Sequence, residues 1–225
     1  MGSAGAGKAL VMGLWLAVAH GQAADPDQWL EFDSTASVPQ VGTGELLFLT
    51  SAPDDDTLQS SSRIGISAES LHDGWVALEQ CYRRLDPVPE TEIVYRYRRM
   101  RDLRVVDTDN IASATVDGDR VQLEDVGRDA ALCVQADVQI LYRLPDGKLE
   151  LRNGPFMRRF LDGYFPMHVA LRVRFPAALL DYVSVSPAPQ PGFAVLREPG
   201  RIDIDAWFAG TLSVAVRFTP RTAHQ

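Results

Sequence analysis

The residues best suited to chemistry are arginines gathered in two short stretches of an otherwise acidic chain. Residues 93–104 read IVYRYRRMRDLR and hold five arginines against one aspartate, and the second stretch is an arginine pair. Arginine forks bind carboxylate, sulfate and phosphate groups through paired hydrogen bonds. The candidate binding residues are therefore Arg96, Arg98, Arg99, Arg101, Arg104, Arg158 and Arg159. If the two stretches converge in the fold, we expect an anionic glycan or an acidic envelope protein as the partner.

The competing interpretation gives these arginines a structural role. On a strand, Arg96 and Arg98 would share one exposed face, while Tyr95 and Tyr97 would share the opposite face. Exposed arginines on a strand commonly pair with acidic side chains of neighbouring strands in the same protein. The sequence leaves both interpretations open.

Motifs for catalysis and for metal binding are weak. Residues 65–69, GISAE, come nearest to the GxSxG nucleophile motif but end in glutamate where the tight turn requires glycine. His72, His168 and His224 have neither HxH nor HExxH spacing. We therefore expect no metal, no cofactor and a binding role. The alternative is a glycan hydrolase or lyase, whose paired carboxylates the sequence cannot identify.

The first 23 residues have the pattern of a secretory signal peptide. Lys8 precedes an apolar run over residues 9–19, and small residues follow as far as Ala23. The run is too short for a membrane-spanning helix, which needs about 20 apolar residues. We expect cleavage after Ala23, export to the periplasm or the exterior, and no transmembrane segment in the mature chain.

Charge and cysteine content narrow the function further. A formal net charge of -8 argues against a nucleic-acid partner, because such binding needs a basic surface. The chain has two cysteines, Cys81 and Cys133, which in an oxidising compartment predict one disulfide. A purely structural envelope component, marked by an uncovered edge strand, is a third functional alternative.

The elements that must position these residues are predicted to be strands. The clearest run, residues 134–144, alternates apolar and polar side chains, which is typical of a strand with one buried face. The segments DGD at 117–119 and PDG at 145–147 predict hairpin turns. The expected fold is all-β, of β-sandwich type, built as one sandwich or as two packed β units, with at most one short helix.

Residues 67–85 and the domain limits are ambiguous. Apolar residues recur at helical spacing over 67–85, but Gly74 also fits a bent strand that carries Cys81. An aromatic segment at 153–166 interrupts the strand pattern and suggests a boundary. The expected parts are a signal peptide at 1–23, an extended polar arm with one or two edge strands at 24–62, a main β-sandwich at 63–160 and a smaller C-terminal β unit at 161–225.

Overall fold

The computed structural model describes residues 44–160 and 163–221, which form two packed β-sheets. The predicted signal peptide and residues 24–43 of the predicted arm lie outside the described residues. The prediction of an all-β fold is confirmed, and so is the prediction of at most one short helix, α1. Among the described residues, no helix has the length and apolar character needed to cross a membrane.

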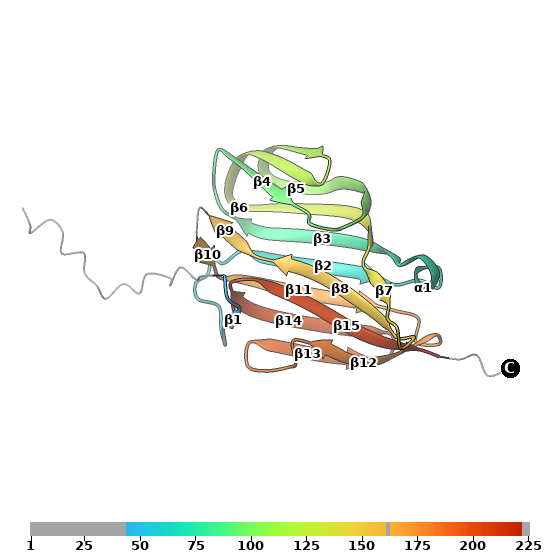
Figure 1. The fold of residues 1–225 in the computed structure, drawn as a ribbon. Coiled ribbons are helices and arrows are strands. Elements are labelled where there is room, and N and C mark those ends of the chain that lie inside the picture. Colours follow the sequence, from blue (N-terminus) through green and yellow to red (C-terminus); the bar gives the residue numbers. More distant parts are fainter. Residues whose placement is uncertain (1–43, 161–162, 222–225) are drawn as a thin grey trace, which may run out of the picture. The chain divides into compact units, whose positions relative to one another are not determined.

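The larger sheet has nine strands and lies behind the smaller one in Figure 1. Its main path runs β1-β14-β11-β2-β3-β6-β4, with β13 beside β14 and β5 beside β6. The strands are β1 (Leu47–Phe48), β2 (Gln59–Gly65), β3 (Trp75–Leu85), β4 (Glu90–Val94), β5 (Met100–Asp117), β6 (Arg120–Gln139), β11 (Met167–Arg174), β13 (Phe193–Glu198) and β14 (Arg201–Ala209).

The smaller sheet has four strands in the order β12-β15-β8-β7. Its four strands are β7 (Leu141–Arg143), β8 (Leu149–Phe156), β12 (Leu180–Ser186) and β15 (Leu212–Pro220). A separate two-stranded ribbon is formed by β9 (Arg158–Phe160) and β10 (Gly163–Phe165). The short helix α1 covers Ser70–Asp73. The inward faces of the two sheets enclose one hydrophobic core. Alternating side chains supply this core, because successive residues of a strand point to opposite faces.

Each of the two sheets combines strands from distant parts of the sequence. β2 pairs in parallel with β11, and β1 pairs with β14. The smaller sheet likewise joins β7 and β8 to β12 and β15. Residues 59–62, expected in a peripheral arm, begin a central strand, and the expected boundary at residues 160 and 161 falls within one compact unit.

The ambiguous segment at 67–85 is mostly strand. The helix α1 covers four residues and ends at Gly74, which has a φ of 76°. β3 begins at Trp75, and the backbone N–H groups of Ile140 and Leu141 donate to the Gly74 carbonyl. Gly74 is thus a left-handed helix end that starts the strand, a conformation that favours glycine.

Replacing Gly74 by alanine is expected to lower the free energy of unfolding by about 2–3 kcal/mol. An added Cβ would lie 2.5 Å from the Leu141 carbonyl oxygen, in addition to the cost of the positive φ. Gly147 is a matched control, because its φ is 82° and nothing lies within 4 Å of an added Cβ. Urea unfolding should place the midpoint of Gly74→Ala well below that of Gly147→Ala. Equal midpoints would contradict the steric argument.

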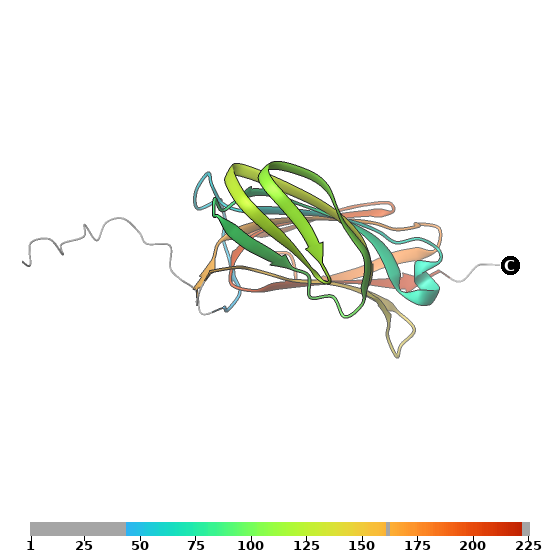
Figure 2. The same ribbon diagram turned by 90° about the horizontal axis from the view of Figure 1, so that it is seen from above.

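The long hairpin of β5 and β6 curls away from the rest of the larger sheet. β6 pairs first with β4, over residues 120–124, and then with β3, over residues 130–139. Between these segments, Asp125 and Asp129 have positive φ values of 49° and 54°. The green strands in Figure 2 accordingly run obliquely to the other strands. β4, the last strand in the main order, lies at one edge of the larger sheet.

The strand on which Tyr95 to Arg98 were expected to alternate ends earlier, at Val94. Val94 pairs with Arg120, the first residue of β6, and Tyr95 donates one further backbone hydrogen bond of 2.8 Å to Asp119 in the turn before β6. Beyond Asp119 the chain turns into β5, so β6 supplies no further partner. Residues 95–99 therefore form a loop. The predicted alternation persists in this loop, because Tyr95 is buried while Arg96 is exposed.

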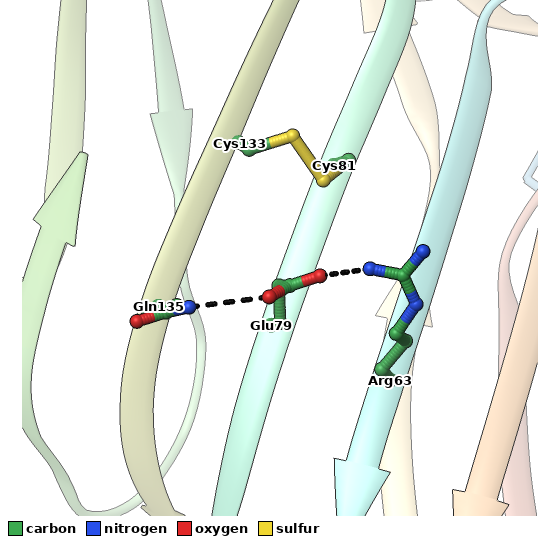
Figure 3. Close-up of a disulfide and its surroundings, with 5 residues drawn as sticks. All are labelled: Arg63, Glu79, Cys81, Cys133 and Gln135. Atoms are coloured by element: carbon green, nitrogen blue, oxygen red, sulfur yellow. Dashed lines mark hydrogen bonds and ion pairs between the residues drawn. A yellow bond between two sulfur atoms is a disulfide. The ribbon is translucent and has the colours of Figure 1, made fainter. Parts of the chain in front are cut away.

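The disulfide between Cys81 and Cys133 is confirmed. The two cysteines are direct partners in the β3–β6 ladder, with their Cα atoms 4.0 Å apart. Both lie half-buried on the face of the larger sheet that points away from the core (Figure 3). On the same face, the Glu79 carboxylate accepts hydrogen bonds from Arg63 and from Gln135.

A buried carboxylate ties β8 to β15 in the smaller sheet. The Glu150 side chain is 5% exposed, and its two oxygens each accept a hydrogen bond of 2.6 Å, one from Arg152 and one from Arg217. Burial alone would raise the pKa of Glu150, but the hydrogen bonds from Arg217 and Arg152 lower it below its usual 4.5. The charged form is thus favoured in the folded protein.

We expect Glu150→Gln to lower the free energy of unfolding by about 1–2 kcal/mol at neutral pH, since the half-exposed arginines remain partly solvated. A pKa lowered by folding contributes stability above the unfolded pKa, and this contribution is lost as the pH falls through the folded pKa. The stability difference between wild type and Glu150→Gln should therefore shrink as the pH is lowered below about 4.5. Chemical unfolding across this pH range measures it, and a constant difference would contradict the linkage.

Candidate ligand-binding pocket

A cavity of about 560 Å³ lies between the β4 region and the β8–β9 region, at the curled end of the larger sheet. Its volume lies within the range of small-molecule sites in proteins. β3 contributes Tyr82 to the wall, and the loop after β4 contributes Tyr95, Arg96 and Tyr97. Most of the remaining wall is apolar and includes Leu58, Leu85, Ile93, Phe156, Met157 and Met167.

Both arginine stretches of the sequence reach this cavity. Arg96 lines it from the loop after β4, while Arg158 and Arg159 line it from β9. Arg158 is committed to the protein itself, because it donates two hydrogen bonds to the Asp86 carboxylate. Arg96 and Arg159 are exposed and have no ion-pair partner within residues 44–160 and 163–221. These two guanidinium groups thus line the cavity without a neutralising acidic side chain among the described residues.

The other predicted arginines lie elsewhere. Arg98 and Arg99 line a separate cavity of about 330 Å³, together with His72 and Arg143. The remaining two, Arg101 and Arg104, belong to β5.

Arg101 pairs with an acidic side chain of a neighbouring strand, as the competing interpretation described, whereas Arg104 binds a neutral amide. Arg101 pairs with Asp137 across the β5–β6 ladder, and its guanidinium lies 4.4 Å from the centroid of the Trp75 ring. Arg104 donates a 2.6 Å hydrogen bond to Gln135. The five arginines of residues 93–104 are therefore divided among two different cavities and the strand β5.

Three tyrosines gather on the inner wall of the cavity, and sequence analysis anticipated only two of them. Tyr95 and Tyr97 were expected on a buried face, and their rings stack with centroids 6.5 Å apart. Tyr82 joins them from β3, where it follows the buried positions Val76, Leu78 and Gln80 at a spacing of two. That alternation was visible in the sequence, but nothing there indicated that β3 and the loop after β4 face each other.

Burial makes the three phenols weaker acids than an ordinary tyrosine. It raises the pKa values of Tyr82, Tyr95 and Tyr97 well above the usual 10, and the proximity of Tyr95 raises the pKa of Tyr82 further. All three therefore stay protonated at physiological pH and can both donate and accept hydrogen bonds.

The hydrogen-bonding capacity of these phenols is used unequally. Tyr97 donates a 2.8 Å hydrogen bond to the Asn153 side-chain oxygen. The Tyr95 hydroxyl and the Asn153 side-chain nitrogen are buried and make no hydrogen bond of ordinary geometry among the described residues. The Tyr82 phenol lies beside the Tyr95 hydroxyl, and a hydrogen-bonding interaction between the two lowers the pKa of Tyr95 and raises that of Tyr82. Buried polar groups in proteins are nearly always paired, and the Tyr82 phenol is the neighbouring group that can pair with the Tyr95 hydroxyl.

The acidic side chains of the cavity are already bound to arginines. Asp86 accepts from Arg158, and Glu92 accepts a 2.8 Å hydrogen bond from Arg120. A hydrolase acting on glycosidic bonds needs two carboxylates free to face its substrate. Among the described residues, no group of three or more histidine, cysteine or acidic side chains is placed to hold a metal ion.

Comparisons with known proteins do not assign this chain to a family. No known family and no curated protein matches it. A crystal structure of the M1 zinc metallopeptidase from Deinococcus radiodurans is similar, with 12% sequence identity and a TM-score of 0.39 over 81% of this chain and 44% of that chain. A mutant of that enzyme bound to a Tyr-Ser-Ala substrate gives 12% identity and a TM-score of 0.40 over 82% of this chain and 45% of that chain. The chain thus spans less than half the length of the solved structures it resembles.

Proposed function

We propose that this chain is an exported binding protein and that the cavity beside β4 and β9 holds an anionic ligand. The observation that carries the proposal is that Arg96 and Arg159 line the same cavity. Arg96 lies on the loop after β4 and Arg159 lies on β9, far apart in the sequence. Charge-assisted hydrogen bonds from arginine suit carboxylate, sulfate and phosphate groups. The ligand is an anionic glycan, a small organic acid or an acidic segment of an envelope protein.

Two features of the chain support export. The pattern of the first 23 residues is typical of a secretory signal. The Cys81–Cys133 disulfide is the kind of bond that persists in oxidising compartments. Mass spectrometry of the secreted form should find the new N-terminus at Ala24 or within two residues of it, and an intact N-terminus would contradict export by cleavage.

A catalytic role on glycans is the alternative, and the cavity supports it less well. Its acidic groups, Asp86 and Glu92, are each bound to an arginine of the protein. A hydrolytic pair would have one carboxyl group protonated and the other free to attack or to activate water. Binding needs no such pair.

Replacing Arg96 or Arg159 by alanine is expected to weaken ligand binding about 10- to 100-fold, the loss typical of one charge-assisted hydrogen bond. The test is a screen of the purified wild type against anionic glycans, small organic acids and acidic peptides, followed by calorimetry on the hits. Arg104→Ala is the matched control, because Arg104 is exposed and does not line this cavity. Ligands that bind wild type, Arg96→Ala and Arg159→Ala equally would refute this site.

A further inference from the structure

We infer that the ligand of this cavity is an acid with an acyl chain, whose carboxylate lies at Arg96 and Arg159 and whose chain lies along the apolar wall. The inference rests on the proposed function and specifies the chemistry of the ligand for the same site. It draws on three properties of the cavity: apolar side chains that remain accessible, polar side chains that are already bound within the protein, and two arginines without acidic partners.

Apolar side chains remain accessible on the elements that face each other across the cavity. Val94, the last residue of β4, is 37% exposed, and Phe160, the last residue of β9, is 40% exposed. Ile93, Pro155 and Met157 also line the cavity and keep part of their surface exposed. Exposed apolar side chains that gather in one place commonly mark a binding surface. The ligand therefore has an apolar part.

The polar side chains of the inner wall are already bound within the protein. Gln80 is buried and donates a 3.0 Å hydrogen bond to Ser60, and Tyr97 donates to Asn153. A sugar ring carries hydroxyl groups around its whole edge, and several of them would lose water against such a wall without gaining a partner. An acyl chain has no hydrogen bonds to lose, so the wall favours it over a glycan.

Methionine side chains make this wall adaptable. Met157 follows β8, and Met167 is the first residue of β11, and both line the cavity. The unbranched methionine side chain has three rotatable bonds and fills irregular space. Such a wall accommodates an acyl chain in several bent conformations, which is why we specify an acyl chain rather than a rigid ring.

The position of the acidic group follows from the charges around the cavity. Asp86 and Glu92 are each neutralised by an arginine of the protein, whereas Arg96 and Arg159 have no ion-pair partner within residues 44–160 and 163–221. Both of these arginines are exposed. A carboxylate can accept charge-assisted hydrogen bonds from them while it remains near solvent, where its charge loses little hydration.

The test uses carboxylates that differ only in chain length. Butanoate, hexanoate, octanoate and decanoate are titrated calorimetrically into the wild-type protein at concentrations at which they form no micelles. Each step of two CH₂ groups should tighten binding about 5- to 15-fold, the gain expected when both groups leave water, until the chain is longer than the cavity. Methyl hexanoate, which lacks the charge, should bind about 10- to 100-fold more weakly than hexanoate.

Variants of exposed apolar residues establish where the chain lies. Val94→Ser and Phe160→Ser should each weaken decanoate binding about 3- to 10-fold and leave butanoate binding nearly unchanged, because only the longer chain reaches the apolar wall. Leu196→Ser is the matched control, since Leu196 is 59% exposed and does not line this cavity. It should bind every acid as wild type does. Thermal unfolding establishes that the three variants are folded.

The outcomes separate the inference from the proposed function. Affinity that does not rise with chain length, or a rise that both Val94→Ser and Phe160→Ser leave intact, overturns the inference. If a glycan or an acidic peptide from the wider screen then binds in a manner that depends on Arg96 and Arg159, the proposed function stands. Binding that rises with chain length but is unchanged in Arg96→Ala and Arg159→Ala refutes the anion site, and the inference with it. If wild type binds none of these acids, the inference is overturned, and the wider screen decides the proposed function.

Discussion

Replacing Cys81 and Cys133 together by alanine is expected to lower the free energy of unfolding by about 2–4 kcal/mol. The disulfide spans 52 residues of sequence and joins direct partners in the β3–β6 ladder. In the chain-entropy description, the bond stabilises the protein mainly by restricting the unfolded chain, and a loop of this length lies near the upper part of that range. Urea unfolding of the double variant and of wild type under oxidising conditions measures the loss.

Reduction provides an independent control for the same bond. Wild type treated with reductant should unfold at the midpoint of the double variant, and the double variant should not respond to reductant. Gln135→Ala is a useful surface control, since Gln135 lies on the same face but contributes only two hydrogen bonds, one donated to Glu79 and one accepted from Arg104. A double variant as stable as wild type would show that the ladder alone fixes β3 against β6.

The second large effect is expected in the core. Phe218→Ala should lower the free energy of unfolding by about 3–5 kcal/mol, because it removes a fully buried ring and leaves a cavity behind. Phe218 is 0% exposed on β15, and its ring centroid lies 5.0 Å from that of Phe175, which follows β11. The ring thus contacts both sheets. Chemical denaturation with fluorescence detection gives the magnitude.

Two further variants calibrate this prediction. Phe175→Ala removes the other ring of the pair, but Phe175 is only half-buried, so a smaller loss is expected. Phe160→Ala should change stability by less than about 1 kcal/mol, because this side chain is 40% exposed. If Phe218→Ala cost no more than Phe160→Ala, the packing between the sheets would be looser than described.

Local patterns in the sequence predicted much of the fold. The period of two predicted over residues 134–144 holds in β6 as far as Gln139, but the predicted strand breaks at Ile140 and continues as β7 of the smaller sheet. The turn at 117–119 joins β5 to β6 as predicted. The disulfide was predicted from the presence of two cysteines together with the pattern of a secretory signal. These features depend on near neighbours or on simple counting. The pairing of β2 with β11 does not, because two parallel strands carry no mutual signal in their own sequences.

The candidate site was predicted only in part, and the reason is geometric. The residue types and the faces of Tyr95 and Arg96 followed from alternation, and Arg159 was identified as a second anion-binding candidate. The separation of Arg98, Arg99, Arg101 and Arg104 from the cavity was not predictable from the sequence. It depends on the end of β4 at Val94 and on a shift of register between Arg101 and Arg104 in the β5–β6 ladder. That shift occurs beside Asp102, whose positive φ of 56° has no distinctive local pattern.

The parallel pairing of β2 with β11 also constrains how the chain folds. β2 pairs through residues 59–65 with residues 168–174, and β1 finds its partner at residues 208–209. Contacts between such distant residues give a topology of high contact order, and folding slows as contact order rises. While the chain emerges from N- to C-terminus, β1 and β2 cannot form their pairings until β14 and β11 have also emerged. A truncated chain that stops before β11 would therefore leave β2 with an open edge, a site at which strands of other chains can add and aggregate.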